Sequence, residues 1–168
     1  ALSEIIEPDF KFNGRSRRPP RDPFNSMLSL GYTLLMYEIY PKVENEGMSP
    51  YYAVLHKNYT NHPALVSDLM EEWRSVIVDS TVLSLVQGHE IKPEHFEYAD
   101  DSQGVFLTKE GLSKFINKFE KTMNRTSRYL LYDQAERTMR KSIQEQCRRM
   151  RIAIANEDVN EYAPVIIR

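Results

Sequence analysis

Apolar residues recur at helical spacing along most of this chain and predict about five or six helices. Two stretches, residues 22–46 and 64–87, are apolar around nearly their whole circumference, so each predicts a central, buried helix. Asp22 followed by proline is a strong start signal for the first helix, and Gly47 is its expected stop. Gly88 is expected to end the second.

The remaining pattern adds helices and very little extended structure. Helices are predicted over about 109–123, capped by Thr108, and over about 127–156. One helical turn is expected after Pro93, and residues 105–107 are expected to be extended, as is the tail from residue 162. Because no further alternation of apolar and polar residues is present, the predicted class is all-α.

Length and composition favour one globular domain over residues 1–168. The chain has 168 residues, and 11% of them are aromatic, which is too many for a disordered chain. The single cysteine, Cys147, excludes an intramolecular disulfide and a cysteine-rich zinc site, and it is expected to be an ordinary packed residue. It fits a reducing cytoplasm, where we expect the protein to lie, and no apolar run is long enough for a membrane span.

Two carboxylates stand three residues apart within the second apolar stretch. On a helix, Asp68 and Glu71 lie on neighbouring turns and can point the same way. His56 could join them; it lies at the end of a short helix that is predicted to begin at Ser49. Two carboxylates and an imidazole suit a divalent cation such as Mg²⁺ or Mn²⁺. The alternative, that these acids form an ordinary solvated helix face, stays open. Glu72 is expected at the surface or paired with an arginine.

Charge is distributed unevenly although the net charge is only −2. Residues 38–104 carry twelve acids and four bases, whereas residues 105–168 carry thirteen bases and eight acids. An acidic centre between basic segments is consistent with a metal site next to a surface that binds a polyanion. The alternative is that the lysines and arginines only keep the exposed faces of helices in contact with water. The candidates for contacts with a DNA backbone are Arg15, Arg17, Arg18, Arg21, Arg137, Arg140, Lys141, Arg148, Arg149 and Arg151.

Four ordered blocks of sequence together resemble a known family. They are RRPPRDPFN (17–25), LSLGYTLL (28–35), GMSPYYAVLH (47–56) and SDLMEEWR (67–74), and the later segments GVFLT (104–108), Gln146 and YAPV (162–165) agree with them. The chain is similar to the C-terminal helical domain of the CRISPR-associated integrase, the catalytic subunit of the complex that inserts new spacers into a CRISPR array.

The resemblance implies a metal-dependent DNA endonuclease and integrase that works by transesterification. It implies that His56, Asp68 and Glu71 are catalytic residues and ligands of Mg²⁺ or Mn²⁺. Glu71 is the expected direct ligand, and Asp68 either ligates the cation or orients a ligand. The implied substrates are double-stranded and branched DNA, in which a 3′-hydroxyl attacks a phosphodiester.

The resemblance also implies parts that these 168 residues lack. The family's first metal-binding glutamate lies in a Glu-Gly-x-x-Ala-Arg-like motif, which does not occur here. We therefore expect a fragment without the first ligand helix and without the N-terminal β-rich domain that forms the homodimer. A small second adaptation subunit is the other implied partner. Because the first ligand is missing, the fragment is expected to be inactive alone, and a non-catalytic helical module that binds DNA or protein stays the alternative.

Overall fold

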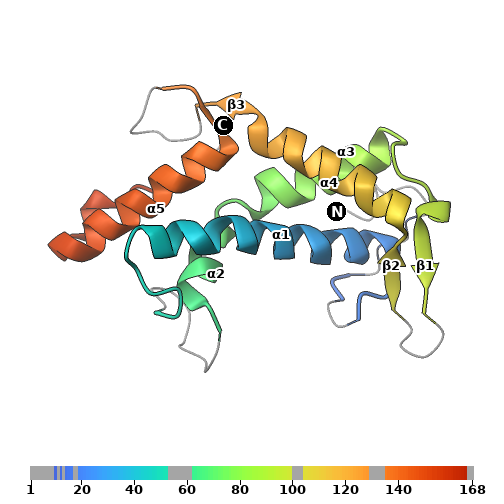
Figure 1. The fold of residues 1–168 in the computed structure, drawn as a ribbon, viewed down its shortest axis with the longest axis horizontal. Coiled ribbons are helices and arrows are strands. Elements are labelled where there is room, and N and C mark those ends of the chain that lie inside the picture. Colours follow the sequence, from blue (N-terminus) through green and yellow to red (C-terminus); the bar gives the residue numbers. More distant parts are fainter. Residues whose placement is uncertain are drawn as a thin grey trace. The chain divides into compact units, whose positions relative to one another are not determined.

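The computed structural model is predominantly helical, which confirms the all-α prediction (Figure 1). Within the described part of the chain there are five α-helices and two short antiparallel strand pairs. The structure describes residues 10, 12, 14–16, 19–52, 62–99, 104–128 and 135–165.

The chain forms two compact units, and each combines two separate stretches of sequence. Unit 1 contains Ala1–Thr33 and Val76–Thr122, and unit 2 contains Leu34–Ser75 and Met123–Arg168. That residues 1–168 are one domain stays a prediction.

Helix α1 begins where the sequence predicts, at Pro23, and ends at Asn45. The Asp22 carboxylate accepts a 2.7 Å hydrogen bond from the backbone N–H of Asn25, which is the expected N-cap contact. Gly47 follows the helix with a φ of +74°, a conformation that other residues rarely adopt. The local start and stop signals were therefore sufficient to place this helix.

The prediction that α1 is buried around its whole circumference holds only for its first turns. Phe24, Met27 and Leu28 are buried, whereas Tyr37 in the second half is 65% exposed. Tyrosine tolerates this position because its ring is amphipathic. The second half of α1 therefore buries one face, with Leu35, Ile39 and Val43 on it.

The second central helix is interrupted, which corrects the prediction of one continuous helix. Helix α2 spans Ala64–Glu71, a π-helical segment covers Arg74–Asp79, and helix α3 spans Ser80–Gln87. At the break, the backbone N–H of Trp73 bonds to the carbonyl of Met70 at 3.0 Å, a step of three residues. The π-helical turns that follow cannot be predicted from the spacing of apolar residues. Such turns are common at functional sites.

In unit 1, a short strand pair stands directly before α4 (Figure 1). Strand β1, Phe96–Tyr98, pairs antiparallel with β2, Val105–Leu107. The extended residues of β2 were predicted, but β1 was not, because three residues are too few for alternation to be recognised. The predicted turn after Pro93 is the 3₁₀ helix Pro93–His95. Helix α4 then runs over Lys109–Asn124.

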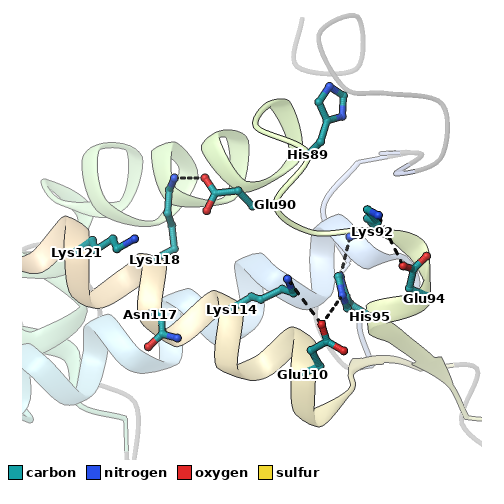
Figure 2. A pocket seen from close by; sticks show the side chains of 10 residues that line it. All are labelled: His89, Glu90, Lys92, Glu94, His95, Glu110, Lys114, Asn117, Lys118 and Lys121. Atoms are coloured by element: carbon teal, nitrogen blue, oxygen red, sulfur yellow. Dashed lines mark hydrogen bonds and ion pairs between the residues drawn. The ribbon is translucent and has the colours of Figure 1, made fainter.

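His95 joins the 3₁₀ helix to the start of α4 (Figure 2). Its Nδ1 accepts a 2.9 Å hydrogen bond from the backbone N–H of Lys92, and its Nε2 lies 3.3 Å from Glu110. The His95 carbonyl accepts a 2.9 Å hydrogen bond from the N–H of Thr108. A Cβ on Gly111 would lie only 2.5 Å from the same carbonyl oxygen, so glycine lets the first turn of α4 come this close. Thr108 also caps α4 as predicted, accepting a 3.2 Å hydrogen bond from the Gly111 N–H.

The last helix starts later than predicted. Helix α5 covers Met139–Asn156 and does not begin near residue 127. Thr126–Ser127 and Arg137–Thr138 instead form a two-residue antiparallel pair, β3 and β4. The Thr138 side chain then caps α5, accepting a 3.2 Å hydrogen bond from the N–H of Lys141. Threonine suits both a strand and an N-cap, which explains the change of structure at this residue.

Close packing holds the interior of unit 1 around Gly31 of α1. A Cβ on Gly31 would lie 2.4 Å from Val78 and 3.2 Å from Phe115, so only glycine leaves room for these side chains.

In the described residues, no helix has the length and apolar character that crossing a bilayer requires. Large, fully buried side chains of unit 2 include Trp73, Leu35, Ile39, Leu65 and Leu69.

Candidate metal site and nucleic-acid surface

The three predicted metal ligands divide between described and undescribed parts of the chain. Asp68 and Glu71 lie one turn apart on α2. Asp68 is only 4% exposed, whereas the Glu71 side chain is 45% exposed. His56 lies outside the described residues, so its proximity to the two carboxylates stays a prediction.

The two described donors have the chemistry that a hard divalent cation requires. Both are carboxylates, and Mg²⁺ and Mn²⁺ prefer oxygen ligands. The Glu71 carboxylate forms an ion pair with Arg74, which lies three residues further along the chain. Among the described residues, no three His, Cys, Asp or Glu side chains are grouped closely enough to hold a metal ion. The described part therefore contains two of the three predicted ligands, and a complete site would need further donors.

His62 is an imidazole beside α2 that was not predicted from the sequence. Its Nε2 lies 3.0 Å from the Ser67 hydroxyl, and Ser67 directly precedes Asp68. The available signal was the position of His62, just before the proline that leads into the helix. This contact adds a polar group to the turn of α2 that carries the buried carboxylate.

Glu72 belongs to a hydrogen-bond network, which corrects the prediction of a surface or arginine-paired residue. Its carboxylate accepts hydrogen bonds from the Tyr162 hydroxyl and from the backbone N–H of Val165. The buried indole of Trp73 donates to Gln146 Oε1 at 2.7 Å, and Gln146 Nε2 donates to the Tyr162 hydroxyl at 2.9 Å. The network ties the end of α2 to α5 and to the segment after it.

The basic segment before α1 has structural contacts of its own. Arg15 Nη1 donates to Asn25 Oδ1 at 2.8 Å, and its guanidinium carbon lies 5.1 Å from the centre of the Tyr32 ring. These contacts hold the segment against α1 within unit 1. Arg21 is exposed. The other two predicted DNA contacts of this segment lie outside the described residues: Arg17 and Arg18.

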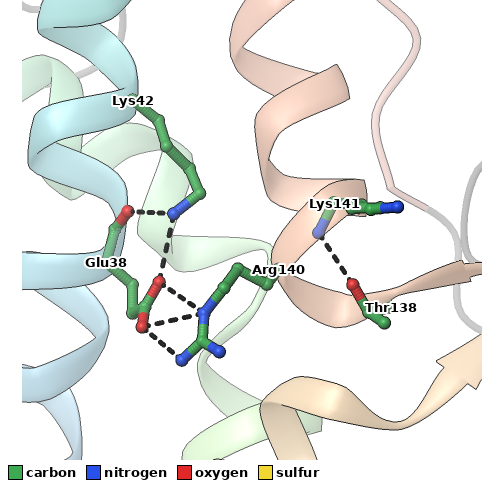
Figure 3. A network of polar contacts seen from close by, with 5 residues as sticks. All are labelled: Glu38, Lys42, Thr138, Arg140 and Lys141. Carbon is green, nitrogen blue, oxygen red and sulfur yellow. Dashed lines mark hydrogen bonds and ion pairs between the residues drawn. The ribbon is translucent and has the colours of Figure 1, made fainter.

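A carboxylate of α1 faces the start of α5 within unit 2 (Figure 3). Arg140 donates to both oxygens of Glu38, with its Nη2 at 2.6 Å from Oε1 and its Nε at 3.0 Å from Oε2. Lys42 Nζ lies 3.0 Å from Glu38 Oε2. The side chain of Lys141 points away from this group (Figure 3). Of the two predicted DNA contacts, Arg140 is thus engaged within the protein, and Lys141 is directed elsewhere.

Further along α5, the predicted DNA contacts also form ion pairs within unit 2. Arg148 and Arg149 share Glu145, at 2.6 and 3.6 Å, and Arg151 lies 3.1 Å from Glu46. Part-exposed pairs of this kind are worth about 0–1 kcal/mol, so they can be exchanged for contacts with phosphate. Arg137 lies in β4. DNA contact by these residues stays a prediction.

Glu38 predicts how acid affects the stability of unit 2. Burial raises the pKa of Glu38, but hydrogen bonds from Arg140 and Lys42 outweigh it and hold this pKa below its usual value of 4.5. A carboxyl group whose pKa is lower in the folded state stabilises that state above its unfolded pKa, and the stabilisation is lost as pH falls through the folded pKa.

We therefore expect Glu38→Gln to lower the free energy of unfolding by about 1 kcal/mol at pH 7. The difference should begin to shrink as the pH falls below about 4.5, where the carboxyl group of the unfolded chain takes up a proton, and it should be lost as the pH falls through the lower folded pKa. Urea unfolding at a series of pH values measures this difference. A difference that stays constant from pH 7 to pH 3 would contradict the ion-pair explanation.

Cys147 is buried in α5, as the sequence predicts. Burial raises the pKa of its thiol to about 12, because the thiolate would lose its hydration. The side chain therefore has a packing role, and a thiolate at neutral pH is disfavoured.

Comparison with known proteins places the chain in a family. A model of the family described as "CRISPR associated protein Cas1" matches residues 1–121. The CRISPR-associated endonuclease Cas1 of Mycobacterium tuberculosis is 39% identical over 133 residues, which is 79% of this chain and 39% of that protein. The CRISPR-associated endonuclease Cas1 3 of Thermus thermophilus is 46% identical over 125 residues, which is 74% of this chain and 37% of that protein. The chain spans about two fifths of the length of these relatives.

Solved structures share the fold. A casposase bound to integration product matches with a TM-score of 0.86 at 22% identity, over 99% of this chain and 50% of the casposase. A CAS1 protein from Thermotoga maritima matches with a TM-score of 0.79 at 23% identity, over 99% of this chain and 49% of that protein. At these identities the likeness concerns the fold alone. The family model, however, covers most of the sequence, and the chain therefore belongs to the CRISPR-associated Cas1 family.

Proposed function

We propose that this chain is the helical catalytic domain of a DNA endonuclease and integrase that joins new spacers to a CRISPR array. The observation that carries the proposal is family membership together with the Asp68 and Glu71 pair on α2. The proposed reaction is transesterification. The 3′-hydroxyl oxygen of a short DNA forms a bond to a phosphorus of the array, and the bond from that phosphorus to the neighbouring 3′ oxygen breaks.

In this proposal Asp68, Glu71 and His56 hold Mg²⁺ or Mn²⁺. When bound, the cation neutralises charge on the reacting phosphate and favours deprotonation of the attacking hydroxyl. Burial restricts the Asp68 side chain to few conformations. The ion pair with Arg74 balances the charge of Glu71 whenever Glu71 is not a ligand.

The proposed substrates are double-stranded and branched DNA. Their backbones would exchange with the ion pairs that now hold basic residues of α5, as at Arg148 and Arg151. We also propose that the whole protein is a homodimer that acts with a small second subunit. A structural neighbour supports the second subunit, since it is a Cas6-RT-Cas1--Cas2 complex, matched with a TM-score of 0.84 at 23% identity over 97% of this chain and 17% of that chain.

Incubating the whole protein with a short DNA duplex, a plasmid that carries a CRISPR repeat, and Mn²⁺ tests the proposal. We expect the duplex to become covalently joined to the plasmid. Joining should cease when the duplex ends in a 3′-deoxy nucleotide, because the attacking oxygen is then absent. EDTA should also stop it.

The outcome separates the proposal from its alternative. Salt-sensitive DNA binding without joining, with the second subunit present, would contradict the catalytic proposal and favour a non-catalytic DNA-binding module. Absence of both binding and joining would leave a helical module that binds protein.

A further inference from the structure

A polar cavity of about 420 Å³ opens in unit 1, between residues 89–95 and one face of α4 (Figure 2). Four lysines line it, and none of them was among the DNA contacts predicted from the sequence. Lys114, Lys118 and Lys121 are spaced four and three residues apart, so they form one stripe along α4. Lys92 belongs to the other wall.

Three glutamates of the cavity balance these lysines in part. Lys118 pairs with Glu90, Lys114 lies 3.7 Å from Glu110, and Lys92 lies 4.0 Å from Glu94. With neutral histidines the cavity residues therefore carry one net positive charge. Most of these side chains are well exposed, and exposed pairs are weak, so a stronger anion can displace the carboxylates.

The two walls of the cavity are joined firmly at one end. His95 is buried there, and the hydrogen bond that its Nδ1 accepts from Lys92 leaves the proton of the neutral ring on Nε2, which faces Glu110. The close approach of Gly111 to the His95 carbonyl fixes the first turn of α4 against this residue. The backbone of the two walls is therefore held together at this end, so that a ligand has to displace only the paired side chains, which reduces the entropic cost of holding it.

We propose that this cavity binds backbone phosphates of duplex DNA. The inference rests on the proposed function, because it takes DNA as the substrate. Several ammonium groups converging on an open, polar hollow match successive phosphates and not an apolar ligand. A metal ion does not suit it, since among the described residues no three His, Cys, Asp or Glu side chains are placed so that they could hold one together.

The test is DNA binding by the whole protein, measured by fluorescence anisotropy with a labelled duplex at several salt concentrations. The variant Lys114→Gln/Lys118→Gln/Lys121→Gln is expected to bind about tenfold or more weakly at low salt. The slope of log K against log salt should become shallower by about 0.9 for each phosphate that is no longer neutralised, thus by about 2–3 in total. An unchanged slope in a folded triple variant would overturn the proposal.

A matched lysine and a matched glutamate sharpen the test. Lys109 is on α4 but outside the cavity, so Lys109→Gln should change the slope much less than Lys114→Gln. An equal change would show a general charge effect and overturn the proposal. Glu94→Gln should tighten binding, because it removes a competing carboxylate, and weaker binding would count against the site. DNA joining by the wild-type protein is a separate readout: if it fails while the triple variant still shows the shallower salt slope, the catalytic proposal is contradicted and the phosphate site is supported.

Discussion

Replacing Glu71 by alanine in the whole protein is expected to abolish DNA cleavage and spacer joining while the helical fold is kept. A catalytic cation supplies several kcal/mol of transition-state stabilisation, so losing a ligand should reduce the rate by orders of magnitude. The fold should survive, because the Glu71 side chain is nearly half exposed and its ion pair with Arg74 is worth about 0–1 kcal/mol. Joining assays across a Mn²⁺ titration, with circular dichroism of the same samples, measure both effects.

Asp68 requires a gentler substitution, because it is buried and has interactions within the protein. Asp68→Asn keeps the volume and an acceptor oxygen but removes the charge that attracts a cation. We expect it to raise the Mn²⁺ concentration needed for half-maximal joining. His56→Ala should abolish joining like Glu71→Ala.

Asp79 provides the matched carboxylate control. It accepts a 2.7 Å hydrogen bond from the Tyr32 hydroxyl within unit 1, and Asp79→Asn retains an acceptor for that bond. This variant should keep joining close to the wild-type level. Comparable losses for Asp79→Asn and Glu71→Ala at equal stability would show that the assignment of the metal site to α2 is wrong.

Replacing Trp73 by alanine is expected to destabilise unit 2 by about 3–5 kcal/mol, the usual cost of removing a buried aromatic side chain. The hydrogen bond from the Trp73 indole to Gln146 adds a separate contribution to the stability of unit 2. Trp73→Phe fills most of the space but leaves the buried Gln146 oxygen without its donor, which should cost about 1–3 kcal/mol. Native-state hydrogen exchange of the α2 and α5 amides measures the local free energy of opening.

A double-mutant cycle tests whether the network acts as a unit. Gln146→Leu alone removes the acceptor of the indole N–H and the amide that donates to the Tyr162 hydroxyl, which keeps its hydrogen bond to Glu72. Trp73→Phe combined with Gln146→Leu removes both members of the first bond, so the double variant should lose less than the sum of the single variants. Tyr98→Phe, at an exposed tyrosine, should change stability by under about 0.5 kcal/mol. Strictly additive losses for Trp73 and Gln146 would show that their hydrogen bond contributes little.

The sequence by itself determined the features that depend on neighbours in the chain. The cap at Asp22, the stop at Gly47 and the cap at Thr108 are contacts within three or four residues, so residue type and spacing are sufficient to predict them. The all-α class followed from helical periodicity. The family followed from ordered blocks of sequence, and residues 1–121 match its model.

Only the tertiary structure decided the features that depend on residues far apart in the sequence. Helix α2 ends at a turn where Trp73 reaches Gln146, 73 residues later, and Glu72 reaches Tyr162, 90 residues later. Likewise, the cavity in unit 1 is lined by residues 89–95 and by α4, and the hydrogen bond from Thr108 to His95 joins these two segments. The pattern of apolar residues predicts which positions are buried, but it does not predict which distant residue will form a hydrogen bond with a buried polar group.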